Sequence, residues 1–442
     1  MKIWKKVLPL LSASMILWGA NNLQAASLAV VQESNLCGVI DTQGNFRIPL
    51  SYDKIVPWTN GALILKKGEL CGVLGQDGQV IVPVEYLNIL IPSHGETYLV
   101  ENNEAHWGAY SSEGKLLLPV IYDEITAVTK DNDCFGVRQG TVWKFVHRDG
   151  TPVSAEEFEY IGEFSEDGLA VIKQQDKWGY AATSGKIVIS CQFDGAKNFS
   201  NGLAAIKQQG KWGFVGEQGI IRIKPQYSEV FSGFSEGLAA VQSAQGKGYI
   251  DKRGNLLIPR DSRYIGPFQN GVAEIHEVKK KVNVWRSLAY GTSIALGGIG
   301  LPPKDLLKSN EKRGFINRQG KEIVSTGYDE VLPFADGMSL VRKGKKWGAM
   351  SIDGKNTIRP RYLAMRPFGS GVSAVRTETG WQLIDKSGQL VKELPAAVTD
   401  AGVMAEGLLP VCIDGKWGYM SKEGDLVVAP RFMKAGSFYA LK

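Results

Sequence analysis

The chain has 442 residues, of which 22% are charged, and a formal net charge of +6 at pH 7. A chain of this length is usually too long to fold around one hydrophobic core, so we expect several cores or a repeated unit. Three lysines and no acidic residue lie in the first 25 residues, so the remainder carries only +3. A nearly neutral chain does not indicate nucleic-acid binding, which needs a concentrated basic face.

Residues 1–25 have the pattern of a secretory signal peptide. Lys2, Lys5 and Lys6 precede a mostly apolar run from Val7 to Leu17, and a small residue, Ala25, ends the segment. The run is too short for a membrane span, which takes about 20 residues. No other stretch is long and apolar enough, so we expect no transmembrane segment. The sequence predicts export to the periplasm or the cell surface, with residues 26–442 forming the mature protein.

The rest of the chain repeats one unit, most clearly from Phe164 to Phe193 and again from Phe199 to Tyr227. Each unit has an anchor position, usually the glycine of a Lys-Trp-Gly triplet. Successive anchors are 34 to 36 residues apart, except for one gap of 66, which gives eleven copies. The anchors are Gly38, Gly72, Gly108, Lys144, Gly179, Gly213, Gly248, Gly314, Gly348, Gln382 and Gly418.

Within each unit we predict three short strands. The first resembles Leu238 to Gln242, the second begins at the anchor, and the third resembles Lys186 to Ile189; all are rich in β-branched or aromatic residues. The second and third are joined by segments such as Asp251 to Gly254, which suit a type I turn closed by glycine at positive φ. For the stretch after the third strand we predict at most one helical or 3₁₀ turn.

The triplet, the turn and the following Ile-Val-x-Pro-x-Tyr segment resemble the WG, or KWG, repeat of bacterial proteins. The resemblance covers nearly all of the mature chain. It implies a β-rich repeat, usually in exported or envelope-associated proteins, and it supplies no catalytic residues. The tryptophan is kept in seven copies and replaced in four, by Cys37, Cys71, Lys247 and Arg313.

The fold class predicted is therefore all-β: a tandem array of about eleven three-stranded units. Eleven units exceed the four to eight blades usual in a β-propeller. We therefore favour an open solenoid or superhelix over a closed propeller.

The periodic tryptophans have two interpretations. They fill the space between neighbouring units, since a large ring covers much apolar area, or they form an aromatic shelf for sugars or peptides. Strict periodicity favours the packing role.

One insertion, at about 276–311, interrupts copy eight at the turn between its first two strands. It is either an extended hairpin or flap, or a contact point on a functional face. As a contact point it offers cations for an anionic polymer and aromatic rings for stacking. The candidate binding residues are Lys279, Lys280, Lys281, Trp285, Arg286 and Tyr290.

Cys37 and Cys71 occupy the tryptophan position in the first two copies. A disulfide needs Cα atoms roughly 4.4–6.8 Å apart, which holds if the units join through a strand ladder but not if whole sheets stack. A Cys37–Cys71 bridge is one hypothesis; two small buried thiols are the other.

No catalytic, cofactor-binding or metal-binding residues are predicted. Gly233 to Gly237 matches the G-x-S-x-G motif of hydrolases, but it lacks the strand–turn–helix context and recurs as the ordinary start of a unit. The four histidines have no metal-ligand spacing.

The function predicted is an exported, non-enzymatic binding or scaffold module of the cell envelope, with a protein or polysaccharide partner. The alternatives are an exported glycan hydrolase with paired carboxylates and a purely structural surface protein.

Overall fold

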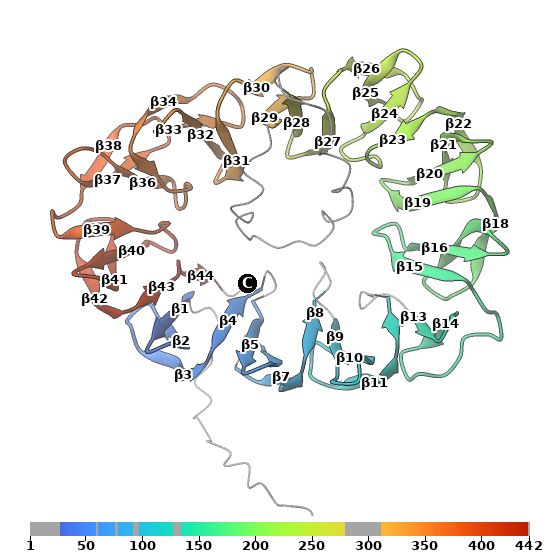
Figure 1. The fold of residues 1–442 in the computed structure, drawn as a ribbon, viewed down its shortest axis with the longest axis horizontal. Coiled ribbons are helices and arrows are strands. Elements are labelled where there is room, and N and C mark those ends of the chain that lie inside the picture. Colours follow the sequence, from blue (N-terminus) through green and yellow to red (C-terminus); the bar gives the residue numbers. More distant parts are fainter. Residues whose placement is uncertain are drawn as a thin grey trace, which may run out of the picture.

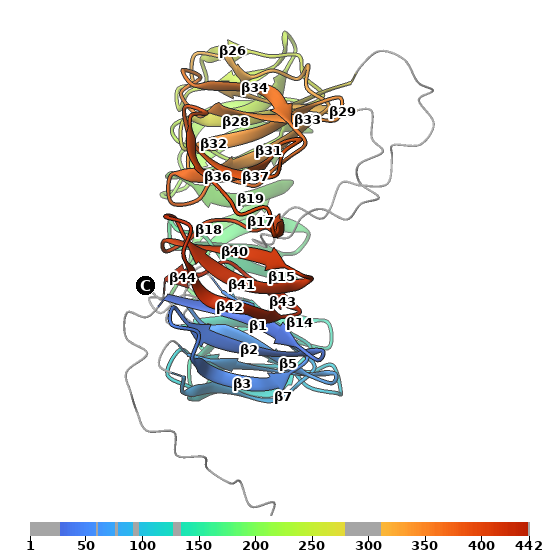
Figure 2. The ribbon, with the colours of Figure 1, turned by 90° about the vertical axis from the view of Figure 1, so that its left-hand side faces the viewer.

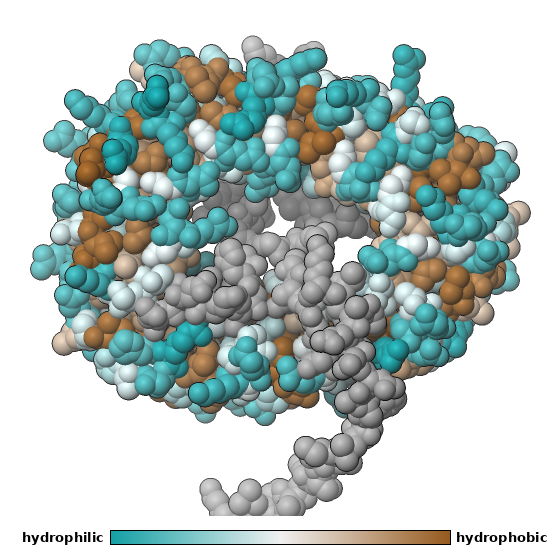
Figure 3. All heavy atoms as spheres, turned by 180° about the vertical axis from the view of Figure 1, so that it is seen from behind, coloured by the Kyte–Doolittle hydropathy of each residue, from teal (hydrophilic) through white to brown (hydrophobic). Residues whose placement is uncertain are grey.

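In the computed structural model, the described residues are 27–58, 61–75, 78–91, 97–126, 134–278 and 311–440. Their strands form eleven sheets, or blades, arranged side by side around a central opening (Figure 1). The edge-on view in Figure 2 and the opposite view in Figure 3 show the same ring. The prediction of an all-β chain with eleven units is confirmed.

A typical blade has four antiparallel strands in chain order, with the first beside the central opening and the fourth at the rim. The first strands are β4 (Lys54–Pro57), β8 (Asn88–Leu90), β12 (Glu124–Ile125), β15 (Tyr160–Phe164), β19 (Gly195–Ser200), β23 (Glu229–Val230), β27 (Tyr264–Gln269), β31 (Glu330–Ala335), β35 (Ala364–Met365), β39 (Val398–Ala401) and β43 (Lys434–Ala435). The second strands are β5 (Leu63–Lys67), β9 (Thr97–Glu101), β13 (Cys134–Gln139), β16 (Leu169–Gln174), β20 (Leu203–Gln208), β24 (Ala239–Ser243), β28 (Val272–Val278), β32 (Met338–Lys343), β36 (Val372–Arg376), β40 (Leu408–Ile413) and β1 (Ser27–Glu33).

The two outer positions complete each blade. The third strands are β6 (Leu70–Leu74), β10 (Trp107–Ser111), β14 (Val142–His147), β17 (Lys177–Ala182), β21 (Lys211–Gly216), β25 (Gly246–Ile250), β29 (Glu311–Asn317), β33 (Lys346–Ser351), β37 (Trp381–Asp385), β41 (Lys416–Ser421) and β2 (Leu36–Asp41). The fourth strands are β7 (Val80–Tyr86), β11 (Leu116–Tyr122), β18 (Ile187–Phe193), β22 (Ile221–Tyr227), β26 (Leu256–Pro259), β30 (Glu322–Val324), β34 (Thr357–Tyr362), β38 (Leu390–Glu393), β42 (Leu426–Phe432) and β3 (Phe46–Tyr52).

The prediction of three strands per unit is wrong, because the stretch expected to hold a helical or 3₁₀ turn forms the inner strand. This strand is short, with only two residues in β12, β23, β35 and β43. Such a short segment has too few residues for an alternating pattern to show.

The prediction of an open solenoid is also wrong, because the two ends of the chain share one blade. The inner strand β43 pairs with β1, which continues through β2 to β3, and the terminal β44 (Tyr439–Ala440) also pairs with β1. A closed ring of β-sheets is a β-propeller, here with eleven blades. Closure removes the two apolar end faces that an open array would leave exposed to water.

The junction between the two chain ends uses the same contacts as the other junctions. Arg431 Nη2 donates a hydrogen bond to Gly44 O at 2.7 Å, just as Arg361 Nη2 donates to Gly388 O at 3.1 Å between two consecutive blades. Eleven apolar clusters fill the eleven junctions between neighbouring blades. The cluster at the closing junction contains Ala29 and Val31 of β1 together with Phe432.

The glycine turns between third and fourth strands follow the sequence prediction. Gly254 has φ of 88° and donates its N–H to Asp251 O at 2.9 Å. The Asp251 carboxylate accepts the backbone N–H groups of Arg253 at 2.9 Å and Asn255 at 2.8 Å. The aspartate therefore holds the turn, and glycine provides the positive φ that closes it.

The anchor glycine allows the fourth strand to approach the third closely. A Cβ at Gly213 would lie 2.5 Å from Ile223 O, and the pairing of β21 with β22 is irregular there. Two blades lack glycine at the anchor. The blade with Lys144 forms no regular fourth strand among the described residues, and Gln382 faces the short β38, which pairs with it directly and shifts register only after Leu383. The glycine is therefore needed where a full fourth strand crosses the anchor.

Candidate functional site

Each tryptophan of the repeat position belongs to a row of side chains that runs across its blade. In one blade Tyr160 of β15 pairs with Lys173 of β16, which pairs with Trp178 of β17, which pairs with Phe193 of β18. Directly paired residues of antiparallel strands share one face of the sheet. The equivalent row in the next blade is Gly195, Lys207, Trp212 and Tyr227.

These rows lie where the second strand ends and the third begins, beside the hairpin turn that joins them. We call the side of the ring that carries these hairpins the hairpin face, and the side that carries the glycine turns the turn face. The row therefore recurs from blade to blade on the hairpin face.

The tryptophan side chains pack against the junction clusters. Trp381 and Trp143 are buried, with exposures of 4% and 5%. Trp178, Trp212 and Trp347 are partly buried and contact the clusters of their junctions. The interpretation of the tryptophans as packing residues is therefore confirmed.

Cations cover several of these rings. The ammonium of Lys173 lies 6.0 Å from the Trp178 ring centroid, and that of Lys207 lies 5.7 Å from Trp212. The Arg342 guanidinium lies 5.7 Å from the Trp347 ring. These are cation–π distances, so the cations are favourable neighbours of the rings that they cover.

The carboxylates of the hairpin face hold the hairpins together. Asp194 accepts the N–H of Gln209 at 2.8 Å, and Asp329 accepts that of Gly344 at 2.7 Å. Glu159 accepts the N–H of Asp176 at 3.0 Å. The hydrogen bonds from Gly344 and Lys312 lower the pKa of Asp329 to about 2. These acidic residues have a periodic structural role and remain ionised, which is not what a general acid requires.

One aromatic cluster on the hairpin face has an exposed member, Tyr160. Tyr160 lies between Trp143 of the preceding blade, at 6.0 Å between ring centroids, and Trp178 of its own blade, at 5.6 Å. The Tyr160 side chain is 41% exposed, and burial raises its pKa. We call these three residues the Tyr160 cluster. Sequence analysis missed it because Tyr160 stands on an inner strand that was not predicted.

The candidate binding residues Lys279, Lys280, Lys281, Trp285, Arg286 and Tyr290 lie outside the described residues. The hairpin that carries the insertion is described on both sides, and β28 pairs with β29 as far as Val278 and Glu311. The candidate contact point therefore stays a prediction.

Cys37 and Cys71 are free cysteines in the structure and lie on different sheets. The thiol of Cys37 donates to Asp53 O at 3.5 Å, and that of Cys71 donates to Leu87 O at 3.6 Å. The Cys37–Cys71 bridge stays a prediction that non-reducing peptide mapping tests.

The G-x-S-x-G segment has a structural role. Ser235 Oγ donates to Phe268 O of the next blade at 2.6 Å, and Ser200 Oγ donates to Phe234 O in the same way, also at 2.6 Å. The expectation that this motif is the ordinary start of a unit is confirmed. Among the described residues, no group of three His, Cys, Asp or Glu side chains is placed to hold a metal ion.

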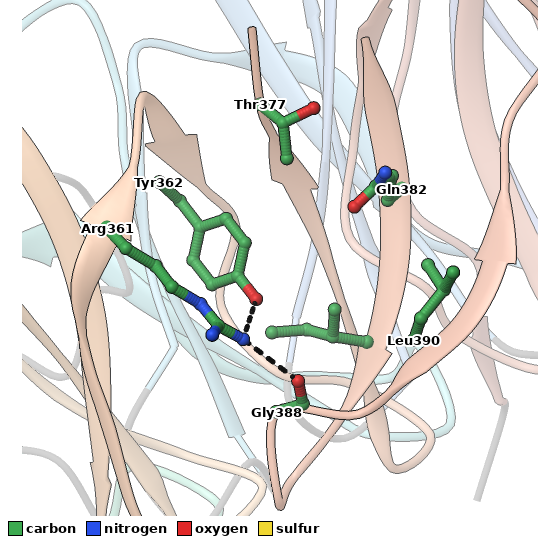
Figure 4. A pocket seen from close by; sticks show the side chains of 7 residues that line it. Arg361, Tyr362, Thr377, Gln382, Gly388 and Leu390 are labelled. Carbon is green, nitrogen blue, oxygen red and sulfur yellow. Dashed lines mark hydrogen bonds between the residues drawn. The ribbon is translucent and has the colours of Figure 1, made fainter. Parts of the chain in front are cut away.

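A hollow of about 360 Å³ lies between two consecutive blades and is drawn in Figure 4. Its polar groups already pair with one another, because Arg361 Nη2 donates to Tyr362 Oη at 2.7 Å and to Gly388 O at 3.1 Å. Thr377 and Gln382 complete its polar lining. Its arginine makes the same contact as Arg431 at the closing junction, so we interpret the hollow as a feature of blade packing.

Within the ranges described above, no helix is long and apolar enough to cross a membrane.

Solved structures match this chain at low similarity. The alignment with a crystal structure of the eukaryotic initiation factor covers 94% of this chain and 98% of that structure's chain, with 9% identity and a TM-score of 0.40. BamB from Moraxella catarrhalis covers 65% and 92%, with 9% identity and a TM-score of 0.34. The C-terminal WD40 domain of Sif2 covers 58% and 91%, with 12% identity and a TM-score of 0.30. We draw no functional argument from similarities at this level.

No curated protein matches the sequence. The model of the WG containing repeat matches nine segments, at residues 38–71, 107–143, 145–178, 178–212, 212–245, 248–275, 314–347, 383–417 and 417–440. These segments make up the greater part of the chain. The chain therefore belongs to the WG-repeat family.

Proposed function

We propose that this WG-repeat propeller is an exported, non-enzymatic binding scaffold of the cell envelope, and that its partner docks on the hairpin face at the Tyr160 cluster. The partner is an envelope protein or a polysaccharide. Repeat architectures present extended surfaces suited to such partners. The signal-peptide pattern of residues 1–25 supports export.

The observation that carries this proposal is the exposed ring of Tyr160 between Trp143 and Trp178. Tyrosine and tryptophan are enriched in binding surfaces because they supply a large contact area with few rotatable bonds. Lys173 and Glu159, which pair at 2.9 Å, lie beside the cluster and offer polar contacts. An aromatic surface with a charged rim suits a sugar ring or a peptide.

The first test is a pull-down from the envelope fraction of the producing organism with the purified protein. Tyr160→Ala should capture the partner at least about tenfold more weakly, since aromatic hot-spot residues contribute about 2 kcal/mol or more. The matched control is Leu257→Ala, which truncates a residue of the outer rim that is 56% exposed. Equal capture by both variants and the unaltered protein would disprove docking at this cluster.

Export has its own test. The N-terminus of the protein recovered from its native host should lack residues 1–25. Recovery of the intact N-terminus from the envelope or the medium would contradict the predicted cleavage.

A further inference from the structure

A second hollow, of about 450 Å³, lies on the turn face between two consecutive blades, β19 to β22 and β23 to β26. We call it the basic hollow. Three of its six lining residues are cations, contributed by both blades. The lining residues are Asn201, Gly202, Leu203, Arg222, Lys252 and Arg253.

Two of these cations depart from the repeat. Arg222 is the third residue after the glycine of its turn, a position where eight of the other ten blades carry aliphatic residues. The exposed examples are Val188, Leu257, Val391 and Val427. The one other arginine at this position, Arg47, pairs with Asp41 of its own turn at 3.1 Å, whereas the turn of Arg222 has Gly216 in place of that aspartate. Arg253 directly precedes its turn glycine, a position occupied in other turns by polar or acidic residues. These are Gln43, Asp77, Glu113, Asp149, Ser184, Gln218, Gln319, Asp353, Ser387 and Glu423.

The departure matters because nine of the other ten blades fold without an arginine at the Arg222 position, and all ten fold without one at the Arg253 position. A residue required by the blade itself recurs with the period of the repeat, as the turn glycine does. Arg253 does not recur, and the one counterpart of Arg222, Arg47, is held by an aspartate that Arg222 lacks, yet Arg222 and Arg253 line one hollow. The fold alone therefore does not account for the pair.

Three acidic groups lie beside residues that line the basic hollow: Asp251, Asp167 and Glu217. Asp251 is held by its own turn, where it accepts the N–H of Arg253 at 2.9 Å. Asp167 accepts the N–H of Gly202 at 3.2 Å. Glu217 Oε1 lies 3.6 Å from the position that a Cβ on Gly202 would take, so this carboxylate lies beside the hollow.

The three cations of the basic hollow differ in their hydrogen bonds. The Lys252 ammonium donates to Asn201 O at 2.6 Å, which fixes it at the wall of the hollow. Within the ranges that the structure describes, the guanidinium groups of Arg222 and Arg253 make no hydrogen bond or ion pair with another residue. Both guanidinium groups can therefore donate hydrogen bonds to a ligand.

We propose that the basic hollow binds a phosphate group, free or carried by a sugar. A guanidinium fork matches two phosphate oxygens, and an ammonium adds a point charge. The volume lies within the range of small-molecule sites and leaves room for a sugar ring beside the phosphate. The hollow is on the turn face, away from the Tyr160 cluster, so this proposal is independent of the proposed function.

Isothermal titration of the purified protein with inorganic phosphate and with glucose 1-phosphate tests the proposal. We expect saturable binding that weakens as NaCl is raised, because exposed charges are screened. Tighter binding of glucose 1-phosphate would indicate a phosphorylated glycan as the ligand; equal or tighter binding of phosphate would indicate the free ion. The absence of saturable binding of either probe at low salt would overturn the proposal.

The variants use residues that other blades carry, so the fold should be kept. Arg222→Val with Arg253→Gln should weaken binding about tenfold or more, since hydrogen bonds to charged groups contribute about 1.5–3 kcal/mol each. Glu217→Gln should strengthen it, because a neighbouring negative charge is removed. Lys422→Gln, in the equivalent turn of another blade, is the matched control and should have no effect. Equal affinity of the double variant and the control would overturn the proposal.

Discussion

The closing junction can be tested with one substitution, Phe438→Ala. Phe438 is 3% exposed and its ring centroid lies 4.7 Å from that of Tyr419. Its cluster also contains Ala29 and Val31 of β1 and Ile40 of β2, from the other end of the chain. Truncation of a buried phenylalanine costs about 3–5 kcal/mol. If the ring is closed, this cost should loosen the N-terminal strands.

Hydrogen–deuterium exchange is the suitable measurement, because a ring of many blades need not unfold in one two-state step. Peptides that cover β1 and β2 should exchange markedly faster in Phe438→Ala. The matched control is Phe199→Ala, which has the same exposure of 3% and the same 4.7 Å distance to a tyrosine ring, that of Tyr180. In the control, faster exchange should be confined to its own junction. Unchanged exchange of β1 and β2 in Phe438→Ala would refute the closed ring.

Three further predictions concern the repeat itself. Gly219 has φ of 78°, so Gly219→Val should destabilise by roughly 1–2 kcal/mol or more; an unchanged melting temperature would contradict the turn. At Gly348 a Cβ would lie 2.2 Å from a carbonyl oxygen of the facing strand, so Gly348→Ala should raise hydrogen exchange in β33 and β34, whereas Gln382→Ala should leave its blade protected. The folded-state pKa of Asp329, at about 2, lies below its ordinary value of 3.8; its contribution to stability is therefore present above about pH 4 and lost as the pH falls toward 2. Asp329→Asn should flatten this part of the acid-unfolding curve, and an unaltered curve would disprove the assignment.

The repeat could be counted from the sequence because its landmarks depend on backbone geometry. A turn glycine at positive φ is required in every blade, and Gly44, Gly219 and Gly424 all have such φ values. The inner strands could not be predicted in the same way. Their pairing depends on the second strand beside them, and a pair such as Glu229 and Val230 carries no periodic pattern of its own.

Ring closure was missed because it depends on residues at opposite ends of the chain. The phase of the repeat nevertheless contained a signal. Within the described residues, the first unit starts at its second strand, Ser27–Glu33, and its inner strand is β43 from the other end. The last unit is followed by Met433 to Ala440, which includes an extra inner strand and Phe438. In a closed ring, one end of the chain supplies the strand that the unit at the other end is missing. An open array would gain no stability from dividing a unit in this way.

A comparison of equivalent positions in the blades separates structural residues from candidate functional ones. The hairpin-face aspartates recur and hold N–H groups, so their abundance does not indicate catalysis. Tyr160 has an equivalent in Tyr264, but Tyr264 lies beside His276, whereas Tyr160 lies between two tryptophans. Arg253 has no counterpart in the other blades, and the one counterpart of Arg222, Arg47, is paired with Asp41. In a repeat protein, a residue that the fold requires recurs at the same position of most blades. A residue that does not recur, or whose contacts differ from those of its equivalents, is a candidate for binding a ligand or partner.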